Sequence, residues 1–272
     1  SAARCAKDCG IETAYVFPNS WRSALVPFFA RIPTRIGTRG HHRGILLTKT
    51  TRESARAKAG HQQWEYVDIL GLGDLQELPP PTLVVPDAAA QAVEALMPSP
   101  EMTDWIALIP GAARGPSKQW PQEHFVSAAQ QIAENHPCRF VVLGTAGEAP
   151  LCDAVAAAIG DRALSLAGKT SLEALIAALD RCATVICNDS GGMHLAASVG
   201  TPVAAIYGIT DPIKTGPLGP NHQLIRADGV TASRDVPRDS IEAREALQSI
   251  SPDRVSQAAL EILKTRNPER SQ

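Results

Sequence analysis

The sequence predicts an α/β protein with parallel sheets. Short apolar runs typical of buried strands alternate with helical patterns through most of its second half. We expect strands at 105–109, 139–143, 163–166, 183–187 and 203–207, with helices at 122–135, 149–159, 171–181 and 192–199 between them. Strands that alternate with helices in this way indicate a parallel sheet with right-handed crossovers.

Two proline-rich breaks divide the chain. At 272 residues it is long enough for two cores. Prolines at 79–81 and again at 98 and 100 cannot continue a helix, which places a boundary between about 78 and 103. We therefore expect one domain at 1–80, a linker at 81–103 and a second domain at 104–266.

Further elements are expected outside the alternating region. The first domain should hold strands at 14–17 and 35–38 and a helix at 20–30 that Pro27 interrupts. The linker should contain a strand at 82–85 and a helix at 87–97. A last helix should run over 252–265, and the chain should fray from Asn267.

Charge is unevenly spread along the sequence. The net charge is −2, yet residues 31–61 carry eight lysines and arginines and a single acid, Glu53. Such a segment suits a phosphate-bearing or membrane-surface partner, although a solvated basic face explains it equally well. Nucleic acid is disfavoured, because no stacking aromatics interleave and the rest of the chain is acidic. The six cysteines lack metal-ligand spacing and indicate reduced thiols of a cytosolic protein.

A turn of small residues follows the apolar run at 183–187. The sequence Asn-Asp-Ser-Gly-Gly at 188–192 allows a sharp turn and a close approach of an anion to the backbone. A helix should start there, and its free N–H groups and positive dipole end would favour a diphosphate. A tight turn without a ligand explains the same residues equally well.

A second loop carries two cations to the same kind of position. It follows the apolar run at 105–109, contains Arg114 and Lys118, and ends at Pro121, which suits the first position of a helix. Ligands bind at the carboxyl ends of strands in open α/β sheets. Arg114 and Lys118 are thus expected to clamp a sugar-nucleotide diphosphate, with solvated loop charges as the alternative.

Three segments resemble a known family. The segments 110–125 (PGAARGPSKQWPQEHF) and 188–212 (NDSGGMHLAASVGTPVAAIYGITDP) resemble the ADP-heptose:lipopolysaccharide heptosyltransferases of glycosyltransferase family nine. Residues 15–37 look more like the second heptosyltransferase of the inner core than the first. The resemblance spans roughly 14–263 and implies the GT-B fold, two Rossmann-like lobes with a cleft between them. About sixty family residues, including the Gly-rich turn with the catalytic base, have no match, so the first lobe is expected to be incomplete.

The resemblance implies an inverting transfer of L-glycero-D-manno-heptose from ADP-heptose to the inner-core heptose of lipopolysaccharide. It assigns catalytic roles to Lys118 and Asp189 and expects the base in the unmatched segment, which leaves the activity of this chain open. The donor-binding residues that it implies are Ala112, Ala113, Arg114, Lys118, Glu148, Thr170, Asp189, Ser190, Gly191, Gly192 and His194. The acceptor-binding residues are Asn19, Ser20, Arg22, Arg35 and Arg39.

Local roles compete with some of these assignments. Glu148 is equally well a helix N-terminal charge. Residues 170–173 read as a capping box, which would explain Thr170 without a ligand. Asp211 is expected to stabilise its own turn. The family's cysteine-containing tail motif is unmatched at 230–237, which puts a role for that segment in doubt.

A divalent metal is not implied, because the sequence contains no DxD motif. No cofactor is expected besides the substrate ADP-heptose. The expected partners are the nucleotide-sugar donor and the inner-core acceptor at the inner-membrane surface, with no nucleic acid. We expect a cytoplasmic monomer, peripheral on the inner face of the inner membrane. Two alternatives stay open: a catalytically silent nucleotide-sugar-binding protein, and a related transferase of the family with another sugar or acceptor.

Overall fold

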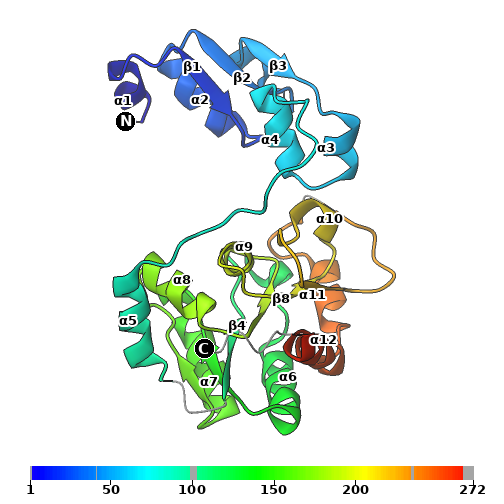
Figure 1. Cartoon of the computed structure of the whole chain (residues 1–272). Helices are drawn as coiled ribbons and strands as arrows, with labels where there is room; N and C mark the ends of the chain where they lie inside the picture. The colour runs from blue at the N-terminus through cyan, green and yellow to red at the C-terminus, as the bar shows by residue number, and fades with distance from the viewer. Residues whose placement is uncertain (1, 41, 99–102, 234–235, 266–272) are drawn as a thin grey trace. The chain divides into compact units, whose positions relative to one another are not determined.

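The computed structural model divides the chain into two compact units, residues 1–79 and 80–272 (Figure 1). It describes residues 2–40, 42–98, 103–233 and 236–265. The expected break at 98–100, part of the 230–237 segment and the fraying from Asn267 lie wholly or partly outside the described residues.

The first unit is a small parallel sheet with helices. Its described residues form three strands in the order β1 (Thr13–Val16), β2 (Thr34–Thr38) and β3 (Lys49–Thr51). Helices α1 (Ala2–Asp8), α2 (Trp21–Phe29), α3 (Ala55–Ala59) and α4 (Gln63–Leu70) and the 3-10 turn η1 (Arg43–Leu46) complete it. The Ser20 hydroxyl accepts the Ser23 N–H and starts α2. The expected interruption at Pro27 is wrong, since α2 continues to Phe29.

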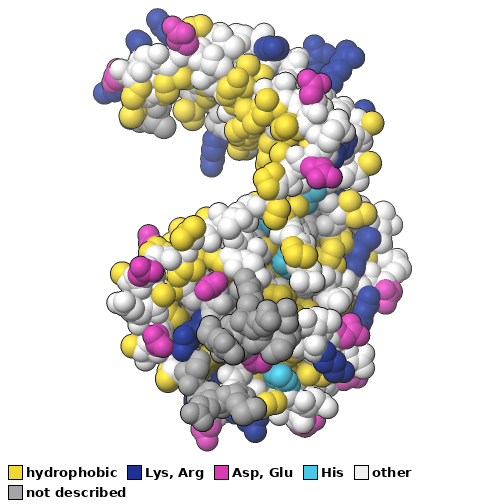
Figure 2. Space-filling view, viewed as in Figure 1, with side chains coloured by type: hydrophobic (Ala, Val, Ile, Leu, Met, Phe, Trp, Pro, Cys, Tyr) yellow, Lys and Arg dark blue, Asp and Glu magenta, His cyan; other side chains and the backbone are white. Residues whose placement is uncertain are grey.

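The core of the first unit is limited. Val16, Ala24, Leu46 and Leu47 form one buried cluster, and Ala57, Trp64 and Val67 form another. Large apolar side chains remain partly exposed, Ile45 most of all at 77%, followed by Phe29 at 67%. Apolar atoms gather visibly on the surface of this unit in Figure 2. This unit therefore depends on a few buried contacts and on polar bonds described below.

The second unit is a parallel sheet of Rossmann type. Its described residues form strands in the order β6 (Ala163–Ser165), β5 (Cys138–Val142), β4 (Asp104–Ile109), β7 (Thr184–Asn188), β8 (Val203–Tyr207) and β9 (Gln223–Arg226). The chain starts in the middle at β4, builds outward to β6, then returns to β7 on the other side. The strand order thus reverses between β4 and β7, the point where such sheets bind ligands.

Helices cover both faces of this sheet. Side chains alternate along β4, so Ile106 and Leu108 pack into one core and Trp105, Ala107 and Ile109 into the other. The first core includes α6 (Gln122–Asn135), α7 (Ala149–Ile159), α11 (Ile241–Gln248) and α12 (Pro252–Thr265). The second includes α5 (Asp87–Leu96), α8 (Leu172–Asp180) and α9 (Gly191–Ser198). Both faces being buried explains why the strands read as continuous apolar runs.

Most expected elements of the second unit are confirmed, and the differences have local causes. The strand expected at 82–85 is absent. This segment follows the prolines at 79–81, and its Leu83 N–H donates one hydrogen bond to the Ser198 carbonyl instead of joining a sheet. The helix expected in the linker is α5, which packs in the second unit. Strand β9 and helix α11 were not predicted. No helix among the described residues is long and apolar enough to cross a membrane.

Candidate functional site

A cavity of about 510 Å³ opens at the carboxyl edge of the second sheet. Ile109 ends β4 and Leu143 follows β5, and both side chains line it. The start of α9 at 190–192 closes the cavity beside them. Loops 111–113 and 144–148 and residues 168 and 170–172 form the rest of its wall. The cavity therefore lies where the strand order reverses.

The backbone at the start of α9 leaves room for an anion to approach closely. Gly192 packs so tightly on β4 that a Cβ there would lie 2.6 Å from Ile109 Cδ1. Gly191 faces open space. The first N–H groups of a helix have no intrahelical acceptor, and the helix dipole favours an anion there. The Ser190 hydroxyl is buried without a partner among the described residues. This rim offers several unsatisfied donors to a ligand.

Lys118 and Asp189 form an ion pair next to this rim. Lys118 ends the 3-10 turn η2 (Pro116–Lys118), and Asp189 directly follows β7. Their side chains are only 14% and 9% exposed, so water screens the pair weakly. Neither residue lines the cavity itself; both line a separate small pocket, and Asp189 directly precedes Ser190 of the cavity wall. The fold thus pairs the Lys118 ammonium group with Asp189, which is 71 residues away in sequence and lies just before the N-terminus of α9.

Asn188 fixes the loop that carries Lys118, a role that sequence reasoning missed. Its Nδ2 donates to the carbonyls of Pro110, at 2.8 Å, and Gly111, at 3.3 Å. Its Oδ1 accepts the Trp120 N–H at 2.9 Å. The fully buried side chain therefore holds both ends of the loop at 110–120. An amide at the end of an otherwise apolar strand was the available signal.

Glu148 both caps a turn and lines the cavity. The 3-10 turn η3 (Ala146–Glu148) starts at Thr145, whose N–H and hydroxyl both donate to Glu148 Oε2 at 2.8 Å. The carboxylate also lies directly against Gly111, where a Cβ would collide with it. Its two expected roles are therefore compatible.

The expected capping box at 170–173 needs correction. The residue that caps α8 is Ser171, whose hydroxyl accepts the Ala174 N–H. An N-cap residue adopts an extended backbone immediately before the helix, and Ser171 has that conformation. Thr170 lines the cavity instead. Its position therefore has no capping explanation.

The other residues expected to bind the sugar-nucleotide donor differ in position. Ala112 and Ala113 line the cavity, but Arg114 is exposed and bonds to no described residue. His194 is exposed as well, although partial desolvation lowers its pKa, with Asp189 opposing this shift and Lys118 adding to it. The structure brings Lys118 rather than Arg114 to the rim. Asp211 accepts the Ile213 N–H at 2.9 Å and stabilises its own turn, as expected.

The expected acceptor residues lie in the first unit. Ser20 caps α2 and Arg22 is exposed. Arg35 donates to the carbonyls of Leu46, at 2.7 Å, and Ile32, at 2.6 Å. Arg39 lines a hollow of about 780 Å³ together with His42, Gly44, Ile45 and Thr50. The basic segment is therefore not one solvated face. Among the described residues no cluster of His, Cys, Asp and Glu is able to hold a metal ion.

The sequence model of glycosyltransferase family 9 (heptosyltransferase) matches residues 3–244. The chain belongs to this family. It is 32% identical over 263 residues to lipopolysaccharide heptosyltransferase 2 of Salmonella typhimurium, covering 90% of this chain and 73% of the relative. It is 32% identical over 258 residues to the Escherichia coli K12 protein of the same name, with the same coverage.

Solved structures of the family have the same fold. The structure of E. coli ADP-heptose lps heptosyltransferase II superposes with a TM-score of 0.78 at 29% identity, covering 96% of this chain and 79% of that one. A family 9 glycosyltransferase from Veillonella parvula superposes with a TM-score of 0.75 at 23% identity, covering 97% and 78%. The α/β architecture of GT-B type and the glycosyltransferase class are thereby confirmed.

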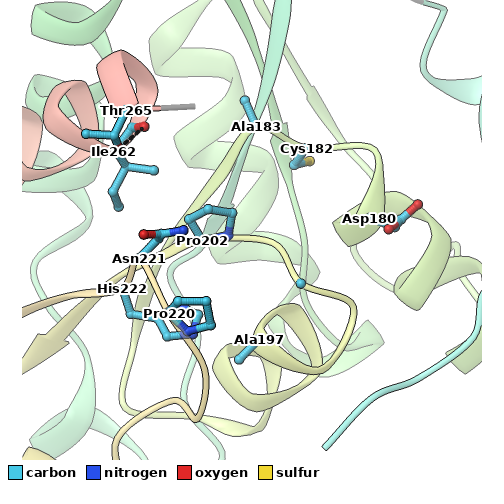
Figure 3. Close-up of a pocket in the computed structure, with 11 residues that line it drawn as sticks. Asp180, Cys182, Ala183, Ala197, Pro202, Pro220, Asn221, His222, Ile262 and Thr265 are labelled. Carbon is cyan, nitrogen blue, oxygen red and sulfur yellow. Dashed lines mark hydrogen bonds between the residues drawn. The ribbon is translucent and has the colours of Figure 1, made fainter. Parts of the chain in front are cut away.

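A second cavity lies at the amino ends of the strands of the second unit's sheet, where β7 and β8 begin (Figure 3). Its volume is about 580 Å³, and Cys182, Pro202, Asn221 and His222 are among its lining residues. His222 Nδ1 accepts the Val203 N–H at 3.2 Å, so its proton sits on Nε2, 3.4 Å from the Leu218 carbonyl. No lysine or arginine of the described residues lines this cavity, which makes this wall a poor diphosphate site.

The His222 contact predicts a pH dependence of stability. Burial lowers the pKa of His222, with the Leu218 carbonyl opposing. The folded state therefore keeps the ring neutral, whereas the unfolded chain takes up a proton near pH 6.5. Stability from this contact is present above about pH 6.5 and is lost as the pH falls below it. Urea unfolding across pH 7.5 to about 5 should show a steeper loss for the wild type than for His222→Asn. Parallel curves would contradict this assignment.

Proposed function

We propose that the chain transfers L-glycero-D-manno-heptose from ADP-heptose to the inner-core heptose of lipopolysaccharide, with inversion at the anomeric carbon. The observation that carries the proposal is the cavity at the switch point of the second sheet, bounded by the start of α9 with the Lys118 ammonium group beside it. The names of the lipopolysaccharide heptosyltransferase 2 relatives support the choice of sugar and acceptor.

In the proposed complex the donor lies along the cavity in one orientation. The diphosphate takes the unsatisfied N–H groups at 190–192 and the ammonium of Lys118. The ribose hydroxyls face Glu148, whose Oε2 is held by Thr145 while its other oxygen remains available. The adenine lies towards Thr170, where Leu172 and Leu175 supply apolar surface. The heptose then extends towards Asp189 and His194.

The chemistry needs charge relief on the leaving group. The acceptor oxygen forms a bond to the anomeric carbon of heptose from the face opposite ADP. The bond from that carbon to the β-phosphate oxygen breaks, and its electron pair stays with ADP. The proton of the acceptor hydroxyl passes to a general base, which the family resemblance places in the segment without a match. Lys118 and the α9 N-terminus meet the growing negative charge, and such preorganised donors contribute roughly 10²–10³ in rate each. These residues support the leaving-group half of the reaction.

The acceptor side is assigned to the first unit. Asn19, Ser20, Arg22, Arg35 and Arg39 lie at or near the loops of its sheet, and exposed cations there suit the phosphates and acidic sugars of the inner core. An enzyme that modifies a lipid-linked acceptor would be located peripherally on the cytoplasmic face of the inner membrane.

A transfer assay tests this function against its alternatives. The chain is incubated with ADP-heptose and a deacylated inner-core oligosaccharide, and the product is analysed by mass spectrometry and NMR. We expect one added heptose with an anomeric configuration opposite to that of the donor, and ADP released in equal amount. ADP-heptose that binds without transfer would support the silent binding protein. Transfer only with another sugar or acceptor would support a related transferase.

A further inference from the structure

The first unit buries a guanidinium group without a carboxylate partner. Arg43 is fully buried, and no acid among the described residues pairs with it. Neutral oxygens take its N–H groups instead. Nε donates to the Thr38 carbonyl at 3.0 Å, and Nη2 donates to Thr38 Oγ1 at 3.0 Å and to Asn19 Oδ1 at 2.9 Å. Nη1 donates to the Pro18 carbonyl.

This group joins the carboxyl ends of two neighbouring strands. Pro18 and Asn19 follow β1, and Thr38 ends β2. Gly37 leaves room for the guanidinium, because a Cβ there would lie 3.3 Å from Arg43 Nη2 and 2.9 Å from the Val16 carbonyl. In α/β folds this edge is the one that binds ligands. Arg43 therefore holds the ligand edge of the first unit together.

The contact decides which way the Asn19 amide faces. A guanidinium is a donor only, so the atom that meets Arg43 must be the amide oxygen. The Thr38 hydroxyl donates to the same oxygen. The Nδ2 group consequently faces away from Arg43 and bonds to no other residue that the structure describes, while the side chain remains half-exposed. Two amide N–H donors are thus held ready at the edge of the sheet.

Stability alone does not explain why a charged side chain occupies the position of Arg43. Burying a cation without a counter-charge costs several kcal/mol, and even buried ion pairs are often replaced by apolar side chains of similar volume without loss. Burial lowers the pKa of Arg43, yet a guanidinium stays charged. An apolar side chain at position 43 would neither orient the Asn19 amide nor place a positive charge next to it.

We infer that Arg43 is a positioning residue, which holds Asn19 so that its Nδ2 donates to an oxygen of the acceptor sugar. The inference rests on the proposed function and adds the residue that orients the acceptor contact. The buried charge of Arg43 polarises the amide and strengthens this donor towards hydroxyl, carboxylate or phosphate oxygens.

The substitution Asn19→Asp separates positioning from folding. It keeps an oxygen for Arg43 and Thr38 and gives the guanidinium a counter-charge, so the thermal midpoint should stay the same or rise. It removes the Nδ2 donor. Binding of a deacylated inner-core oligosaccharide, measured by calorimetry with ADP present, should weaken about tenfold or more. ADP affinity should change less than about twofold, because the second unit supplies that site. Arg43→Met should weaken the oligosaccharide similarly, with a lower thermal midpoint.

Gly40→Asp is the matched control for added charge. A Cβ at Gly40 would lie 3.6 Å from Asn19 Oδ1, so its carboxylate adds the same charge beside an intact amide. We expect a smaller loss of oligosaccharide affinity than in Asn19→Asp. Equal losses in both variants, an unchanged affinity in Asn19→Asp, or no oligosaccharide binding by the wild type would each overturn the inference. Absence of ADP binding by the wild type would instead overturn the proposed function.

Discussion

Lys118→Ala is expected to weaken ADP binding by about ten- to a hundredfold and to slow heptose transfer by roughly 10²–10³. Two effects act in the same direction. The diphosphate loses its ammonium partner, and the largely buried Asp189 carboxylate is left without its cation beside the same anion. Calorimetry with ADP and single-turnover transfer measure the two quantities separately.

Two further variants separate these effects. Lys118→Ala combined with Asp189→Asn removes the stranded carboxylate, so stability and part of the ADP affinity should return while transfer stays slow. Arg114→Ala should change both quantities much less, because Arg114 is exposed and it is Lys118 that pairs with Asp189 beside the rim. ADP affinity in Lys118→Ala equal to that of the wild type would remove Lys118 from the site.

Asn188→Ala is expected to lower the free energy of unfolding by about 2–4 kcal/mol. The carbonyls of Pro110 and Gly111 and the Trp120 N–H lose their buried partner together. Because the same bonds hold both ends of the loop that carries Lys118, ADP affinity should fall as well. Urea unfolding and calorimetry are the measurements.

Trp120→Phe is the matched comparison for Asn188→Ala. It removes the Nε1 bond to the Ile250 carbonyl, which is 3.0 Å long, and keeps the backbone N–H that Asn188 accepts. We expect it to cost stability with little change in ADP affinity. A loss below about 0.5 kcal/mol in Asn188→Ala would show that the loop does not depend on this side chain.

The sequence was sufficient for the alternating part of the fold, for a physical reason. Strands β4, β5, β7 and β8 are buried on both faces, so each is a continuous apolar run bounded by polar or small residues. Strand β9 was missed because it lies at the edge of the sheet and its sequence, QLIR, mixes polar and apolar residues. Strand β6 at the opposite edge was predicted from the run at 163–166, so the mixed sequence of β9, more than its edge position, hid it.

The site was predicted in part. Glycines and small residues at 190–192 and the loop at 110–121 are local signals, and the structure brings both loops to one edge. The Lys118–Asp189 pair and the anchoring by Asn188 are tertiary contacts between residues about 70 positions apart, which no local pattern contains. The cap of α8 moved by one residue, from Thr170 to Ser171, because two adjacent hydroxyl residues fit the same signature.

The basic segment shows what composition leaves out. A count of charges treats its cations alike, whereas the structure buries Arg43 and ties Arg35 to two backbone carbonyls. Arg56 stacks on the Trp64 ring at 3.4 Å and donates to the Leu75 carbonyl. Burial depends on the fold, so neutralising the segment as a whole would mix structural and binding effects.

The claim that the second unit binds the nucleotide is tested most directly by a crystal structure of the chain with ADP. We expect a diphosphate within hydrogen-bond distance of the N–H groups at 190–192 and of Lys118 Nζ, with the ribose against Glu148. Density for ADP in the cavity beside His222, or none at an ADP concentration that saturates calorimetric binding, would contradict it.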